Sequence, residues 1–456
     1  MATLIQAAPL QKKRRTKRTS RDVLANLFMV AWICVIMNGA LRKWVLPGVA
    51  AVYLIQDLPL LAAYIYALWK GLIWGGKLAW MCVIGSSVLA LQSMLQVILI
   101  DLRPRTAIIG LHHYIFYLPI LFIAPVCYNL KHRQQFIRWN MLLIVPMSLI
   151  AALQSRAPAG AWINRTSAGE DTGLGGIGAD RVRATGTFNF TVAYAVWCGF
   201  AVGLVLGEWL CPPGRRCFKS KAMLLICTMG AAVATLVSGS RAGVLLAALA
   251  FLGGFAAVIV TRNIKLIVRF SAVLVLLPIL IVIGYWSAPD SFNAVLSRFS
   301  GEENQASMLV RIDHMVTAFT WASHYSILGA GIGFGIPAAN PGAVGFNLSE
   351  VESIRIVEEL GTFVGTVVVL VRYGAGLLLL AACFRILKLP RGHSLPHAVP
   401  LGFAVFPTVM IGGLTASAPV VATQAFFWIA LVLSALLFRN EPLEAGAFQL
   451  SKRGKR

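Results

Sequence analysis

An arginine follows a run of small residues in the stretch "TLVSGSRAGVLL", residues 235–246, between two long apolar segments. The planar guanidinium of Arg241 presents paired donors that match the oxygens of a phosphate or a carboxylate. Placing such a charge beside segments long enough to cross a bilayer is costly. The position therefore predicts that Arg241 binds an anion at a membrane surface, and the alternative is an ordinary arginine at a helix end.

Further basic residues fall on the same predicted side of the membrane as Arg241. Of the twelve in this set, eleven are arginine, whereas the opposite side mixes 15 arginines with 12 lysines. The twelve are Arg42, Lys43, Arg103, Arg105, Arg156, Arg165, Arg181, Arg183, Arg241, Arg298, Arg311 and Arg355. This bias predicts an anion-binding outer face, and the alternative for each residue is contact with lipid headgroups.

The composition determines which elements must position these arginines. The 456 residues are 58% hydrophobic and only 12% charged, so most of the chain must face lipid. We expect an all-α integral membrane protein that partners the lipid bilayer through about twelve transmembrane helices. The expected spans are 23–41, 48–69, 78–100, 106–128, 136–154, 187–209, 221–239, 242–261, 265–285, 357–386, 399–414 and 420–438.

The basic residues also predict the orientation. If the segment "QKKRRTKRTSR" is cytoplasmic, 27 of the 40 lysine and arginine residues lie on that side, as the positive-inside rule requires. We therefore expect a basic cytoplasmic tail (1–22), a membrane domain (23–438) and a second cytoplasmic tail (439–456). The net charge of +23 is explained by this topology and needs no nucleic-acid partner.

Two outer loops, 155–186 and 286–356, are long enough to carry function. In the second, the stretch 304–323 has an apolar face and predicts an amphipathic helix at the membrane surface. The glycine-rich "GAGIGFG", residues 329–335, lacks a preceding strand and a P-loop lysine, so we interpret it as a turn rather than a nucleotide site.

The metal, cofactor and transport alternatives depend on few residues. Cys211 and Cys217 lack companion ligands, so the sequence predicts no metal and no other cofactor. Polar residues within the expected spans are consistent with a transporter as an alternative, because intramembrane charges often mark proton paths. These residues are Asp57, His112, His113 and Arg372.

Four stretches, in this order, give the chain a family resemblance. The segments "RATGTFNFTVAYA" (183–195), "TLVSGSRAGVLL", "RIDHMVTAFTWASHYSILGAGIGFG" (311–335) and "VESIRIVEELGTFVG" (351–365) resemble the O-antigen ligase and O-antigen polymerase superfamily of bacterial inner membranes. The resemblance covers roughly 183–386.

The resemblance implies a GT-C-like, metal-independent glycosyltransferase that takes a glycan from undecaprenyl diphosphate at the periplasmic face. It implies that Arg241 and Arg311 hold the diphosphate, and we place Arg181, Arg183, Ser240 and Arg355 among the groups that contact diphosphate or glycan. The expected activity is polymerisation of O-antigen or exopolysaccharide repeat units, beside partners such as a chain-length regulator. The alternatives are a ligase that transfers finished glycan to lipid A-core or another acceptor, and a transporter or flippase of lipid-linked glycan.

The proton of the acceptor hydroxyl has several candidate acceptors in this sequence. Ligases of the family carry a histidine and an asparagine just before Glu-x-Gly, where this chain has Glu352 and Ser353, and this departure favours a polymerase. Glu352 could act as the base if its pKa were raised, could bind sugar hydroxyls, or could orient an arginine of the diphosphate site. His314 and His324 are alternative bases.

Overall fold

The computed structural model describes residues 19–72, 76–165, 176–178, 181–218, 220–300, 309–310, 313, 317, 320, 326–336, 351–388, 396–411 and 421–438. Within these residues the fold is all-α apart from one short antiparallel pair of strands. Nine of the described helical segments are long and apolar enough to cross a bilayer. The chain is therefore a multi-pass membrane protein.

The first half of the chain contains seven α-helices and the two strands. They are α1 (Ser20–Ala40), α2 (Asp57–Trp69), α3 (Lys77–Leu99), α4 (Pro104–Ile115), α5 (Ile120–Cys127), α6 (Leu130–Arg156), β1 (Gly176–Gly178), β2 (Arg181–Val182) and α7 (Thr191–Leu210). Short turns are η1 (Leu41–Val45), η2 (Ala50–Leu54), η3 (Trp162–Asn164) and, after α7, η4 (Pro213–Arg215).

The second half contains eight α-helices within its described residues. It comprises α8 (Lys221–Val237), α9 (Arg241–Thr261), α10 (Ile264–Ser287), α11 (Pro289–Ser300), α13 (Glu352–Leu360), α14 (Thr362–Leu387), α15 (Ala398–Ile411) and α16 (Val421–Leu436).

Nine of the twelve expected spans coincide with helices long enough to cross a membrane. The other three coincide with shorter apolar helices, Lys221–Val237, Ala398–Met410 and Thr423–Leu436. Apolar runs of about 20 residues therefore located the helices, although they did not predict the length of each one.

Two of the spans differ from the expectation in where the helix breaks. The span expected at 106–128 is interrupted, because α4 ends at Ile115 and α5 starts at Ile120. The span at 357–386 was expected to tilt or break near Arg372–Gly374. It is continuous there and breaks instead at Gly361, whose φ of 79° separates α13 from α14.

The helix α7 is the centre of the bundle and is buried along nearly its whole length. Its glycines recur every fourth residue and let neighbouring helices approach closely: a Cβ at Gly199 would meet Leu246 of α9, and one at Gly203 would meet Leu401 of α15. Trp32 of α1 packs nearby, stacked on Phe426 of α16 at 5.3 Å between ring centroids. These contacts join α1, α9, α15 and α16 around α7.

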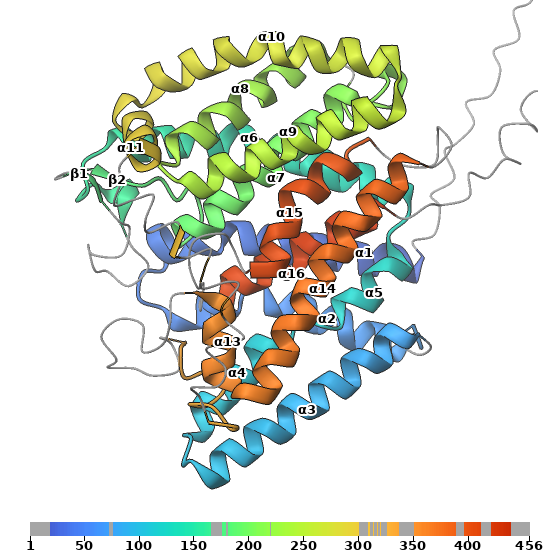
Figure 1. Ribbon diagram of the computed structural model, residues 1–456, viewed down its shortest axis with the longest axis vertical. Helices are drawn as coiled ribbons and strands as arrows, with labels where there is room; N and C mark the ends of the chain where they lie inside the picture. Colours follow the sequence, from blue (N-terminus) through green and yellow to red (C-terminus); the bar gives the residue numbers. More distant parts are fainter. Residues whose placement is uncertain are drawn as a thin grey trace, which may run out of the picture.

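The described parts of both long loops gather at one end of the helices. In Figure 1, β1, β2 and α11 lie together at the upper left, and α13 lies lower, beside α4. Arg156, the last residue of α6, donates to the carbonyl groups of Trp286 and Ser287 at the end of α10, at 3.0 and 2.6 Å. The described ends of these two loops therefore meet where α6 and α10 end.

Candidate functional site

A buried group of charged side chains surrounds the start of α13. Glu352 Oε1 accepts hydrogen bonds from Arg355 Nη2 at 2.8 Å, from Arg372 Nη1 at 3.0 Å and from Gln424 Nε2 at 2.9 Å. Arg355 Nη1 also donates to Glu359 Oε1 at 2.7 Å. We call Glu352, Arg355, Glu359 and Arg372 the α13 cluster; its two positive and two negative charges balance.

A base at this position would need a raised pKa, and the neighbours of Glu352 in the α13 cluster determine the pKa of its carboxyl. Burial raises the pKa of the Glu352 carboxyl, but the guanidinium groups of Arg355 and Arg372 outweigh burial and bring the pKa to about 2. A carboxylate held this strongly in its ionised form is a poor proton acceptor. The contacts favour the third sequence-based alternative, in which Glu352 orients arginine side chains.

Arg355 was expected to contact the diphosphate or the glycan, and its surroundings do not suit that role. Its side chain is 1% exposed and its donors point at Glu352 and Glu359. The two carboxylates also raise the pKa of Arg355 well above its usual value, although burial alone would lower it. Arg355 is therefore paired within the protein rather than presented to a substrate.

The glycine-rich turn holds α13 in place. The amides of Ala330 and Gly331 donate to the carbonyls of Glu358 and Glu359, at 2.7 and 3.2 Å, and Gly335 N–H donates to Glu359 Oε1 at 3.0 Å. Positive φ values at Gly329, Gly331 and Gly333 permit this path. The stretch "GAGIGFG" is thus a turn, as expected, and its amides bind protein groups.

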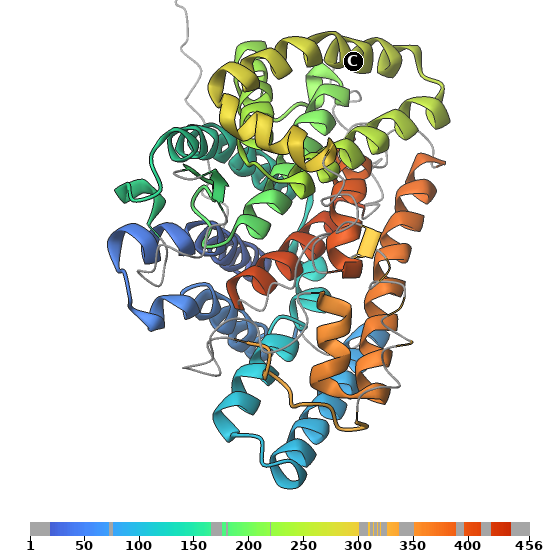
Figure 2. The same ribbon diagram turned by 60° about the vertical axis from the view of Figure 1, so that its left-hand side comes forward.

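Helices α3 and α4 complete the surroundings of α13. From α3, Gln96 Nε2 donates to Glu359 O at 2.8 Å and Gln92 Nε2 to Leu360 O at 3.0 Å. From α4, Tyr114 OH donates to Glu359 Oε2 at 2.7 Å. Figure 2 shows α13 beside the first part of α14. Four helices and one turn therefore fix the α13 cluster.

Arg241 is the first residue of α9 and is half-buried. The preceding turn depends on Gly239, with a φ of 60°, and on Ser238 Oγ, which accepts from the amide of Ser240 at 3.2 Å. Ser240 is the N-cap residue of α9, although its side chain makes no capping hydrogen bond. The "SGSR" stretch therefore starts the helix and leaves Arg241 at its N-terminal end.

The start of α9 and the α13 cluster lie at the same end of the bundle. Helix α15 runs antiparallel to α7, since Gly207 of α7 faces His397 and Gly203 faces Leu401, while α9 runs parallel to α7. The end of α15 thus lies at the end where α9 begins. Arg372 Nε donates to Val409 O, near that end of α15, at 3.3 Å.

The structure describes only some of the other predicted site residues. Arg183 follows β2 and is half-buried, whereas only the backbone of Arg181 is described. Arg311, His314 and His324, together with most of the amphipathic stretch 304–323, lie outside the described residues. Their predicted roles stay predictions.

The four residues reserved for a proton path do not form a single group. His112 Nε2 lies 3.1 Å from Asp57 Oδ2, and Tyr117 OH donates to Asp57 Oδ1 at 2.8 Å. Arg372 belongs to the α13 cluster instead. His113, next to His112 on α4, is 2% exposed, and neither ring nitrogen has a hydrogen-bond partner among the described residues.

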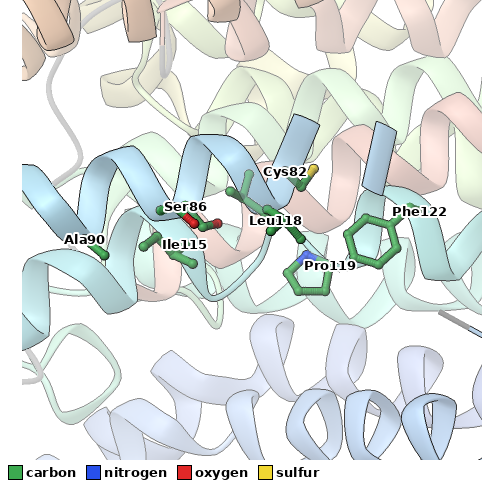
Figure 3. A pocket seen from close by; sticks show the side chains of 9 residues that line it. Cys82, Ser86, Ala90, Ile115, Leu118, Pro119 and Phe122 are labelled. Atoms are coloured by element: carbon green, nitrogen blue, oxygen red, sulfur yellow. The ribbon is translucent and has the colours of Figure 1, made fainter. Parts of the chain in front are cut away.

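A pocket of about 380 Å³ lies between α3 and the break separating α4 from α5. Figure 3 shows Cys82, Ser86 and Ala90 of α3 facing Ile115 and Phe122. Its lining is mostly apolar and includes none of the predicted site residues. The pocket therefore does not unite the candidate groups.

Sequence reasoning missed the contributions of Glu359, Tyr114 and Gln424 to the α13 cluster. The spacing of Glu352, Arg355 and Glu359, three and then four residues apart, places all three on one helix face and could have indicated an ion-pair group. Nothing in the sequence links Gln424 to Glu352. Comparisons with protein-family models, with curated proteins and with solved structures find no match to this chain.

Proposed function

We propose that the chain is a glycosyltransferase of the periplasmic face of a bacterial inner membrane, which polymerises undecaprenyl-diphosphate-linked repeat units of an O-antigen or exopolysaccharide. One observation carries the proposal: the start of α9 with Arg241, the described parts of both long loops and α13 gather at one end of a multi-pass bundle. A lipid-linked donor presents its diphosphate at the membrane surface. The resemblance over 183–386 supports the same reaction.

The reaction joins an acceptor hydroxyl oxygen to the anomeric carbon while the bond from that carbon to the diphosphate oxygen breaks. The departing diphosphate keeps the electron pair, so negative charge grows on its oxygens, and fixed guanidinium groups stabilise that charge without a metal. Arg241 and Arg311 are the proposed donors, with Ser240, Arg181 and Arg183 nearby. Glu352 positions Arg355 and Arg372 rather than accepting a proton.

The acceptor proton has two proposed destinations. His314 or His324 takes it, or it passes late in the reaction to the departing diphosphate. Transfer of the finished glycan to lipid A-core or another acceptor uses the same groups and is the alternative outcome. A chain-length regulator or another assembly protein is the expected protein partner of a polymerase.

The proposed topology places both termini in the cytoplasm and lets all twelve apolar helices cross the membrane in a GT-C-like arrangement. Reporter tags fused after residue 170 or 345 should then report periplasmic exposure, and tags after 215 or 393 cytoplasmic exposure. The reverse pattern at any of these four positions would remove the active-site face from this proposal.

A substitution at Arg241 tests the chemistry. Arg241→Lys keeps the charge but loses the planar pair of donors, so we expect most polymer to disappear while the protein still accumulates in the membrane. Arg262→Lys, just after the opposite end of the same helix, is the matched control and should leave polymer unchanged. A normal amount of polymer from Arg241→Lys would mean that Arg241 is an ordinary arginine at a helix end and does not bind the diphosphate.

One observation favours the transporter alternative. Helix α4 has twelve residues, about 18 Å, so the break that follows it would lie near the middle of the membrane. His112 lies 3.1 Å from Asp57 beside this break, and broken helices with charged groups at mid-membrane are typical of transporters. A flippase would move lipid-linked glycan across a reconstituted bilayer without consuming it. Asp57→Asn would then stop movement, whereas a glycosyltransferase would release free undecaprenyl diphosphate.

A further inference from the structure

The end of α1 contains a π-helical turn with two adjacent buried cations. Residues Leu41–Val45 form this turn, which closes with a hydrogen bond of 2.7 Å from the amide of Leu46 to the carbonyl of Leu41. Arg42 is 7% exposed and Lys43 is 1% exposed. Turns of this kind are rare and frequently occur at functional sites.

The ammonium group of Lys43 is held by neutral oxygens only. Its Nζ donates to Thr185 Oγ1 at 2.8 Å, to Gly186 O at 3.0 Å and to Phe188 O at 2.8 Å. These three bonds use all the ammonium donors and tie α1 to the segment that precedes α7. No carboxylate of the described residues pairs with Lys43, so no described side chain balances its positive charge.

Arg42 contacts a different segment, and one of its donors has no partner among the described residues. Its Cζ lies 3.4 Å from the centroid of the Tyr53 ring, in a cation–π contact. Its Nη1 is buried and has no hydrogen-bond partner among the described residues, none of whose carboxylates pairs with Arg42. A buried donor without an acceptor is unfavourable, and more so when the donor is charged.

We propose that the turn Leu41–Val45 is a binding site for a phosphate-class anion, in which Arg42 donates to a phosphate oxygen and Lys43 adds a second positive charge. An anionic oxygen would satisfy the free donor and balance two buried cations at once. The chemistry fits two sources, the diphosphate of a lipid-linked donor and the phosphate of a bilayer lipid. Only the first source rests on the proposed function.

The direct test is the binding of inorganic pyrophosphate to full-length protein in phosphatidylcholine nanodiscs, measured by titration calorimetry. Arg42→Gln should weaken binding by about 10- to 100-fold, the usual value of hydrogen bonds to a charged group. The matched control is Arg138→Gln, an exposed arginine on the opposite predicted side, which should bind like the wild type. Equal affinities for Arg42→Gln and wild type would overturn the site.

A second variant covers the case in which Arg42→Gln fails to fold. Arg42→Lys keeps a cation over Tyr53 but loses the paired donors, so it should fold and bind pyrophosphate several-fold more weakly than the wild type. An affinity of Arg42→Lys equal to that of the wild type would also contradict the proposal. So would a wild-type protein that binds no pyrophosphate and retains no anionic lipid.

Native mass spectrometry of the wild type separates the two sources. Retention of undecaprenyl diphosphate in preference to phosphatidylglycerol assigns the site to the donor, and the reverse preference assigns it to a bilayer lipid. Either ligand should be retained less by Arg42→Gln. Binding that depends on Arg42, without any glycan transfer, would support the anion site and contradict the glycosyltransferase proposal. Glycan transfer with unaltered anion binding in Arg42→Gln would support the glycosyltransferase proposal and contradict the anion site.

Discussion

Two groups of buried cations lie at the same end of the helix bundle and differ in their counterions. In the α13 cluster, Arg355 and Arg372 contact Glu352 and Glu359, so the charges balance. In the turn at the end of α1, Lys43 has three neutral oxygens as its partners. The balanced cluster fixes helices to one another, whereas the unbalanced turn keeps positive charge for an anion from outside the chain.

The expected cost of neutralising one charge differs between the α13 cluster and the turn at the end of α1. A buried ion pair contributes little net stability over an apolar pair, but removal of one partner leaves an isolated charge and costs about 3–5 kcal/mol. The α13 cluster should therefore fail when one member is neutralised. The turn has no carboxylate partner in the described part of the chain, so neutralising a cation there should cost less.

Glu352→Gln is the change with the largest expected effect. It removes the charge that both Arg355 and Arg372 contact, so we expect a loss of about 3–5 kcal/mol in the free energy of unfolding. The loss would be measured by thermal unfolding in detergent and by the level of protein in the membrane. Asp101→Asn, an exposed acid, is the control and should change neither.

The same variant separates a positioning residue from a base. If Glu352 were the base, Glu352→Gln would keep its stability and its affinity for the lipid-linked donor, while turnover would fall by about 10²–10⁴. Normal stability with that kinetic loss would contradict our assignment of Glu352.

A double substitution tests whether Glu352 and Arg372 act as a pair. Removing both, in Glu352→Gln with Arg372→Met, should cost less than the sum of the single changes by about 0.5–3 kcal/mol, because no unpaired charge remains between them. Unfolding of the two single variants and the double variant gives this coupling energy. Strict additivity would mean that the 3.0 Å contact does not stabilise the protein.

Lys43→Met should have a smaller effect than Glu352→Gln. The apolar side chain relieves the burial of a charge, but it leaves Phe188 O without the ammonium donor, at about 1–3 kcal/mol, whereas Gly186 O keeps its hydrogen bond from Gln154 Nε2 at 3.1 Å. The two effects oppose each other, so we expect a net loss near the lower end of that range. A loss equal to that of Glu352→Gln would remove the distinction between the two regions.

The smallest expected effect is the response of the α13 cluster to pH. The pKa of Glu352 falls from 4.5 to about 2 on folding, so its stabilisation is complete above pH 4.5 and is lost as the pH falls toward 2. The difference in unfolding temperature between wild type and Glu352→Gln should therefore stay constant from pH 8 to pH 5. A difference that vanished between pH 8 and pH 6 would instead indicate a raised pKa.

The sequence predicted the membrane helices because apolar length alone determines whether a segment can cross a bilayer. It did not predict the break between α4 and α5, because Phe116–Pro119 is part of a continuous apolar run and hydropathy does not report backbone hydrogen bonds. The break at Gly361 was signalled only by a glycine, which the sequence offers at many positions.

The candidate site shows a similar limit. The position of Arg241 at the start of a helix followed from its neighbours in the chain and agrees with the structure. The role of Glu352 did not follow, because its partners Arg372 and Gln424 are 20 and 72 residues away and reach it through the packing of α14 and α16. Local patterns predict helices, whereas the electrostatic surroundings of a carboxylate depend on distant segments.

Chain growth by the purified protein tests the central claim most directly. Full-length protein in nanodiscs would be given an undecaprenyl-diphosphate-linked oligosaccharide, and the glycan length and the released undecaprenyl diphosphate would be followed together. We predict a ladder of longer glycans with one undecaprenyl diphosphate released for each transfer, lost in Arg241→Lys and kept in Arg262→Lys. Unconsumed donor that merely appears on the opposite face of a reconstituted bilayer would contradict the account and identify a transporter.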